Sequence, residues 1–455
     1  MTESVSKENI LGTERIGRLL IKFGMPGIIS LVVNSIYNVV DQIFIGQGVG
    51  YLGNAATNIT YPFTMFVLAC GMLIGDGAAT NMSLYLGMGK KNEASRAAAF
   101  GSVAALLLGA VLAVVLVALM EPLCWAFGAT EANIGYCLDY GTIISAAIPA
   151  GMVCCSYMSI LRADGKPKIG MIGLLLGCGI NIVLDPIFIF ICGWGVKGAA
   201  LATILGEIAN AILYLIALFR KQQFIELNKE AFLSCLSMAK NVLRLGVASF
   251  ILQLAIVIAI IIQNKVLATV GAASEYGADI PLAALGVTMK VFTIVIAVVN
   301  GLSSGAQPIY GYNYGSGNLD RVKAAFLRVF IFAEIVLIAA FAVFQLAPMA
   351  IVNIFGSQDE LYNEFVVRCL KIFLFGLPLT GLQTVSCTFF QSLGRPVQAA
   401  ILSLSRQIIF MIPILFIFVN IFGIDGCLYM GPVADVCALI LTLIIFKLYW
   451  KKIFR

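Results

Sequence analysis

Six acidic residues stand inside long apolar stretches of this 455-residue sequence, where a charge requires an explanation. They are Asp41, Asp76, Asp185, Glu207, Glu334 and Asp435. An ionisable side chain at the centre of a membrane costs roughly 3 kcal/mol on insertion scales, so it normally faces a bundle interior or a water-filled cavity. The six residues are therefore the first candidates for binding an ion or a polar solute.

Asp185 has the strongest local support. It lies in the segment NIVLDPIF, and Asn181 precedes it by one turn on the same helical face. Pro186 has no N–H, so the carbonyl of Ile182 loses its helical partner inside the membrane, where a neighbouring helix or a bound cation must replace it. These groups predict a site for Na⁺ or H⁺, which Thr203 could complete from the next helix. Holding two helices together is the alternative role.

Asp41 is the second strong candidate. Asn34, Tyr37 and Asn38 precede it at spacings that place all four side chains along one face of the first apolar stretch. This polar stripe predicts that the helix faces a cavity, although Asp41 also lies late enough to sit near the outer interface.

The other charges are open to two interpretations. Glu207 shares a helical face with Thr203 and Asn210, which fits either a cavity wall or a contact with another helix. Hydrogen bonding between helices explains Asp76 and Asp435 equally well, and Glu334 is a weaker candidate than either. We expect Lys290, the single base placed inside a span, to neutralise a nearby carboxylate.

Several kinds of chemistry are excluded. Histidine is absent, so a serine–histidine or cysteine–histidine enzyme is not possible. Residues 301–305 fit G-x-S-x-G but lack the base and lie in an apolar stretch. No Walker A motif occurs, and the twelve cysteines show no C-x-x-C pairs. We expect no enzyme activity, no cofactor and no nucleic-acid partner.

Composition requires that the elements carrying these residues lie in a membrane. Apolar residues make up 61% of the chain and charged residues 11%, and the mean hydropathy is +1.00. A helix crosses the hydrocarbon core in about 20 residues. We predict twelve spans, near residues 16–45, 56–85, 97–119, 136–160, 169–191, 198–219, 240–270, 281–308, 324–346, 365–392, 398–420 and 427–447.

The positive charges predict the orientation. Lys and Arg accumulate in cytoplasmic loops, and with both termini inside, most of the 29 Lys and Arg residues fall on the cytoplasmic side. The predicted cytoplasmic set includes Arg162, Arg395 and Arg406. Four bases fall outside: Lys197, Lys265, Arg368 and Lys371. We therefore predict a multi-pass protein of the bacterial cytoplasmic (inner) membrane.

The sequence repeats itself. Gly77-x9-Gly87-x-Gly89 recurs as Gly305-x9-Gly315-x-Gly317, and three shorter patterns recur at nearly the same offset, about 228 residues. An even number of spans per copy gives a parallel repeat, which is typical of alternating-access transporters. We predict a six-helix bundle at 1–219, a cytoplasmic linker at 220–239 and a second six-helix bundle at 240–455.

Four segments together resemble one transporter family: VVDQIFIGQ, NIVLDPIFIF, GVKGAALAT and GAQPIYGYNYGSGN. They resemble the MATE (multidrug and toxic compound extrusion) family, and within it the bacterial branch of MepA-type exporters. The resemblance implies an all-α fold whose two bundles enclose a V-shaped central cavity. It also implies a cation site at Asp41, Asn181, Asp185 and Thr203.

The expected activity follows from this resemblance. A monomeric secondary antiporter would export amphipathic, often cationic, drugs and other organic compounds in exchange for H⁺ or Na⁺, in contact with membrane lipid. The cavity is expected to be lined by Asn34, Tyr37, Asn38, Glu207, Gln263, Met289 and Gln307. No acid in the second half matches Asp41 or Asp185, so a second ion site is not expected. Flipping a lipid-linked precursor is the alternative function, which would favour a cationic cavity.

Overall fold

The protein is almost entirely helical. The computed structural model describes residues 10–220, 222–277, 279–355 and 360–454, and no strand occurs in these ranges. The first half contains α1 (Ile10–Thr13), α2 (Ile16–Val49), α3 (Tyr51–Gly87), α4 (Lys91–Ala118), α5 (Met120–Ala126), α6 (Ile134–Ala146), α7 (Ile148–Ala163), α8 (Pro167–Pro186) and α9 (Gly195–Arg220).

The second half follows the short helix α10 (Lys229–Leu233). It contains α11 (Ala239–Ala272), α12 (Asp279–Gly315), α13 (Leu319–Leu346), α14 (Pro348–Phe355), α15 (Glu360–Arg368), α16 (Thr380–Ser392), α17 (Pro396–Leu404), α18 (Ile412–Phe422) and α19 (Gly426–Ile453). Three π-helical segments interrupt these helices: Ile187–Ile191, Cys369–Phe373 and Ser405–Met411.

The number of membrane crossings agrees with the predicted twelve. Ten helical stretches in the described ranges are long and apolar enough to cross a membrane, and the bent pair α6–α7 makes an eleventh. The longest stretch, Pro396–Trp450, contains two crossings, because the chain reverses at Gly423 and α18 packs against α19. Gly423 has a φ of 60°, a conformation that glycine adopts without strain.

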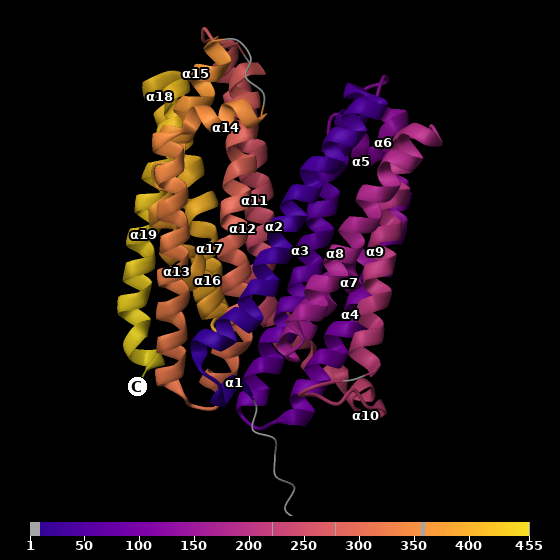
Figure 1. The fold of residues 1–455 in the computed structure, drawn as a ribbon, viewed down its shortest axis with the longest axis vertical. Coiled ribbons are helices and arrows are strands. Elements are labelled where there is room, and N and C mark those ends of the chain that lie inside the picture. The colour runs from indigo at the N-terminus through magenta and orange to yellow at the C-terminus, as the bar shows by residue number, and fades with distance from the viewer. Residues whose placement is uncertain (1–9, 221, 278, 356–359, 455) are drawn as a thin grey trace, which may run out of the picture.

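The two halves have matching helices. α2 and α11 each contain 34 residues, α3 and α12 each contain 37, and α4 and α13 each contain 28. Figure 1 shows two bundles side by side that converge near α1 and α10 and diverge towards the opposite end. This arrangement is the predicted fold class, a duplicated six-helix bundle in a V shape.

Glycines bring the two bundles into direct backbone contact near their converging end. α2 packs against α12, and α3 packs against α11. A Cβ at Gly27 would overlap the carbonyl oxygen of Gly301, and a Cβ at Gly246 would overlap that of Leu73. Only glycine allows the backbones to approach so closely, so these positions determine how tightly the halves close.

The segment between the bundles is fixed to the first of them. The buried carboxylate of Asp164 accepts hydrogen bonds from the backbone N–H groups of Gln223 (3.0 Å) and Phe224 (2.9 Å), and Lys166 lies 2.8 Å away. Lys91 lies 2.5 Å from Glu226 and lowers the pKa of that exposed carboxyl group. The exact domain boundaries at 219 and 240 stay a prediction.

Replacing Asp164 by asparagine is expected to release this segment. The amide removes the charge that pairs with Lys166, and hydrogen bonds to a charged group contribute about 1.5–3 kcal/mol each. We expect a lower thermal unfolding midpoint in detergent and faster proteolysis within residues 222–228. Asp320→Asn is the matched control, because the Asp320 side chain is fully exposed. Unchanged proteolysis would show that Asp164 does not hold the segment.

Candidate cation and substrate site

The structure brings the four predicted cation-site residues together from three helices. Asn181 of α8 donates hydrogen bonds to Thr203 of α9 (3.0 Å) and to Asp185 (3.4 Å). Asp185 also belongs to α8, whereas Asp41 belongs to α2. Their two carboxyl groups lie close enough to interact with each other. Tyr37 reaches the same place, because its hydroxyl group interacts with Thr203.

The cluster presents oxygen atoms that no residue in the described part of the chain satisfies. Asp41, Asn181 and Asp185 are 8%, 2% and 0% exposed, and each has one buried side-chain oxygen without a hydrogen-bond partner. Two carboxylates in contact repel each other unless a proton or a cation lies between them. The orphaned oxygens therefore fit a bound H⁺ or Na⁺, for which carboxylate, amide and hydroxyl oxygens are suitable ligands.

The backbone at this site departs from a regular α-helix. Pro186 ends α8, and the next five residues, Ile187–Ile191, form a π-helix. Such segments occur frequently at functional sites. Gly177 and Gly206 let α8 and α9 pack closely, since a Cβ at Gly206 would lie 2.5 Å from the carbonyl oxygen of Gly177.

Tyr140 of α6 was missed by the sequence argument. It interacts electrostatically with Asp41, Asp185 and Glu207, so it lies beside all three carboxylates. Its only signal in the sequence was a hydroxyl group inside a predicted span. Glu207 lies against Gly151 of α7, whose Cβ would be 3.2 Å from the carboxylate. Three acids and two tyrosines therefore line one region of the N-terminal bundle.

A family model described as MatE matches the chain twice, at residues 26–187 and 255–417, once in each half. The chain belongs to the MatE family. The two matches also confirm the internal duplication.

The MatE chain has relatives over nearly its whole length. The "Multidrug export protein MepA" of Staphylococcus haemolyticus (strain JCSC1435) is 26% identical, and the match covers 95% of this chain and 93% of that protein. The protein of the same name from Staphylococcus aureus (strain MRSA252) is 25% identical, with coverage of 95% and 94%. This is therefore a multi-pass bacterial membrane protein of a multidrug export family, not an enzyme family.

Solved structures show the same fold. The "Crystal structure of MATE in complex with MaL6" has a TM-score of 0.91 at 23% identity and covers 100% of this chain and 99% of that chain. The "Outward-facing conformation of a multidrug resistance MATE family transporter of the MOP superfamily" also has a TM-score of 0.91 at 23% identity, with 99% of both chains covered.

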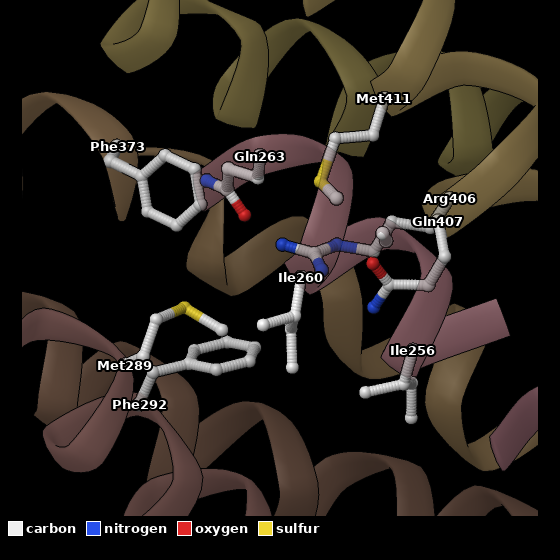
Figure 2. A pocket seen from close by; sticks show the side chains of 10 residues that line it. Ile256, Ile260, Gln263, Met289, Phe292, Phe373, Arg406, Gln407 and Met411 are labelled. Carbon is white, nitrogen blue, oxygen red and sulfur yellow. The ribbon is translucent and has the colours of Figure 1, made fainter. Parts of the chain in front are cut away.

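The C-terminal bundle of this MatE chain contains a small pocket between α11, α12 and the π-helical segments Cys369–Phe373 and Ser405–Met411. Gln263 and Met289, both predicted to line the cavity, lie on its wall. Figure 2 shows the guanidinium group of Arg406 among Gln263, Gln407 and Ile260. The pocket therefore combines polar groups with apolar side chains such as Ile256 and Phe292.

The predicted position of Arg406 was wrong. It lies inside a membrane span rather than at the cytoplasmic side, and its Nε lies 2.5 Å from Asp435 of α19. A buried base is tolerated when a carboxylate neutralises it. The prediction that Lys290 neutralises a nearby carboxylate is also wrong. Lys290 is exposed and forms no ion pair in the described ranges.

Gln307 lies away from both sites. It is 3% exposed, donates to Thr80 across the interface of the halves (2.8 Å) and accepts from Arg162 (3.2 Å). The expectation that it lines the cavity does not hold here, because it satisfies buried groups between the bundles instead.

Gln307 belongs to a polar cluster that we call the interlobe network: Asp76, Thr80, Ser159 and Arg162 of the first half with Ser249, Gln307 and Gln391 of the second. Both oxygens of Asp76 accept hydrogen bonds, from Ser159 (2.9 Å) and from Ser249 (2.7 Å). Arg162, which was predicted on the cytoplasmic side of the membrane, lies 3.6 Å from Asp76, and its side chain is buried. This network joins the halves with charged groups.

Proposed function

We propose that this protein is a secondary antiporter that exports amphipathic, often cationic, organic compounds in exchange for H⁺ or Na⁺. The observation that carries the proposal is the interacting pair Asp41 and Asp185, which are both buried and which each keep one oxygen without a hydrogen-bond partner in the described ranges. The relatives named as multidrug export proteins support the choice of substrate.

The residues divide the work of the cycle as follows. Asp41, Asn181, Asp185 and Thr203 hold the coupling ion, while Asn34, Tyr37, Asn38 and Glu207 contact the substrate together with Gln263 and Met289. If the ion weakens substrate binding, substrate weakens ion binding by the same factor, because such coupling is reciprocal. One monovalent ion entering down 100 mV supplies about 2.3 kcal/mol.

The test uses sealed vesicles that contain the purified protein. Addition of a fluorescent organic cation such as ethidium should move H⁺ or Na⁺ in the opposite direction, and an imposed ion gradient should drive ethidium against its own gradient. Ethidium transport that neither moves nor responds to either ion would overturn the proposal.

A lipid-linked precursor flippase is a second candidate, favoured by one observation. Lys290 is an exposed base without an ion pair in the described part of the chain, so it leaves one positive charge in the C-terminal bundle unbalanced. Vesicles in which a phosphate-bearing lipid crosses the bilayer without ion movement would support this function instead.

The proposed orientation places both termini in the cytoplasm, and native cysteines offer a test. Cys192 is exposed and follows α8 at the diverging end, while Cys235 follows α10 at the converging end. A membrane-impermeant maleimide added to intact cells should label the chain, and Cys192→Ser should remove most of that label. Cys235→Ser, the matched control, should leave it unchanged. The reverse result would invert the topology.

A further inference from the structure

A second hollow lies on the flank of the C-terminal bundle, away from the cation site. It has a volume of about 450 Å³ and is lined chiefly by Lys371, Phe375, Phe418, Phe422, Tyr429 and Pro432. Figure 1 shows that α18 and α19, which form two of its walls, lie on the side of the molecule that faces away from the N-terminal half. We call it the aromatic groove. The aromatic groove therefore belongs to the outer flank of the C-terminal bundle rather than to the space between the bundles.

The wall of the aromatic groove is organised before anything binds. Phe418 packs edge to face on Phe422 with ring centroids 5.6 Å apart, and Phe422 packs in the same way on Tyr429. Phe375 is held edge to face by Phe341 of α13. Despite these contacts, Phe375 and Phe422 remain 59% and 51% exposed. Rigid apolar rings with a free face suit a flexible acyl chain, since the protein loses little entropy on binding.

One base stands at the rim without a counter-charge. Lys371 is exposed and has no ion pair in the ranges that the structure describes. Its neighbour Arg368, one turn away, is already engaged by Asp425 (2.5 Å) and by the Tyr276 hydroxyl (2.9 Å). The groove therefore offers one free positive charge beside an apolar wall.

The depth of the groove matches the headgroup region. Phe422 ends α18, and Tyr429 lies in the first turn of α19, so both stand where the chain leaves the membrane. Tyrosine and lysine are typical of this interfacial zone. We infer that the aromatic groove is a binding site for an anionic phospholipid of the outer leaflet, with an acyl chain on the rings and the phosphate on Lys371. The choice of leaflet rests on the proposed orientation.

The test measures lipid binding to the purified full chain in a neutral detergent, without an ion gradient, so it does not depend on the antiport test. Native mass spectrometry compares phosphatidylglycerol and phosphatidylcholine with identical acyl chains. One lysine near an anionic headgroup is worth about 5-fold in affinity. We therefore expect the unaltered protein to bind phosphatidylglycerol about 5-fold more tightly than phosphatidylcholine. The Lys371→Gln variant should bind the two lipids equally.

Two control variants distinguish the contribution of the Lys371 charge to lipid binding from that of the apolar groove wall. Lys265→Gln removes another exposed lysine predicted on the same side of the membrane and should keep the preference. Phe422→Ala should weaken the binding of both lipids while leaving their ratio unchanged. Equal binding of both lipids to the unaltered protein, a preference that survives Lys371→Gln, or a groove occupied by a second copy of the chain would each overturn the inference.

Discussion

Asp185→Asn is expected to abolish active export while the protein remains folded in the membrane. The asparagine side chain has nearly the same size and can still accept the 3.4 Å hydrogen bond from Asn181. It cannot carry the negative charge that a coupling ion requires. Exchange of one monovalent ion for one ethidium cation moves no net charge, so the concentration gradient of the ion drives it, and a tenfold ion gradient can sustain roughly a tenfold ethidium gradient. In vesicles with such an ion gradient, the measured accumulation ratio of ethidium should fall from about ten to about one.

Glu334→Gln is the matched control for this change. It removes a carboxylate from α13 of the other bundle, where Glu334 packs against Gly381 rather than beside the cation site. Accumulation by this variant should stay near that of the unaltered protein. If the Asp185→Asn and Asp41→Asn variants both accumulated ethidium normally, the coupling site would have to lie elsewhere.

Gly246→Ala is expected to prevent the bundles from closing at their converging end. The added Cβ would overlap the carbonyl oxygen of Leu73, a backbone atom that cannot rotate away. Overpacking of this kind costs about 1–3 kcal/mol, which shifts an equilibrium between closed and separated halves by roughly 5- to 150-fold. Transport should fall accordingly, and distances between spin labels on α3 and α11 should lengthen.

Gly179→Ala is the corresponding control. Gly179 also lies within a membrane helix, but a Cβ there would meet nothing within 4 Å. Its transport and spin-label distances should be unchanged. If Gly246→Ala behaved in the same way, closure at this end would not limit the cycle.

Local spacing accounts for what could be predicted about the cation site. Asn181 and Asp185 lie one turn apart, and Pro186 marks the break in the helix, so a single segment contained most of the information. Asp41 and Thr203 were found in the same way, as polar residues inside segments that are predicted to lie in the hydrocarbon core of the membrane. The duplicated glycine pattern and the apolar composition predicted the twelve spans and the two bundles.

Long-range pairing accounts for the failures. Arg406 was counted with the cytoplasmic bases although the predicted span 398–420 contains it, and the partner that neutralises it, Asp435, lies 29 residues further on. Arg162 and Gln307 meet across the interface between the halves at a sequence separation of 145 residues. Tyr140 lies near the start of the predicted span 136–160, far in sequence from Asp41 and Glu207, with which it interacts. Contacts of this kind depend on tertiary packing, which local patterns do not record.

The way the linker is held has a consequence for how the halves can move. Asp164 fastens its beginning, and α10 and the 3-10 segment Cys235–Met238 both pack against α4 of the first half. Nearly all of the connecting chain is thus attached to the first bundle. The free covalent connection between the halves is reduced to the point where α11 begins, at Ala239. Such a short connection acts as a pivot. The second half can rotate and tilt about it, but no flexible linker is left that would allow the second half to translate along the first.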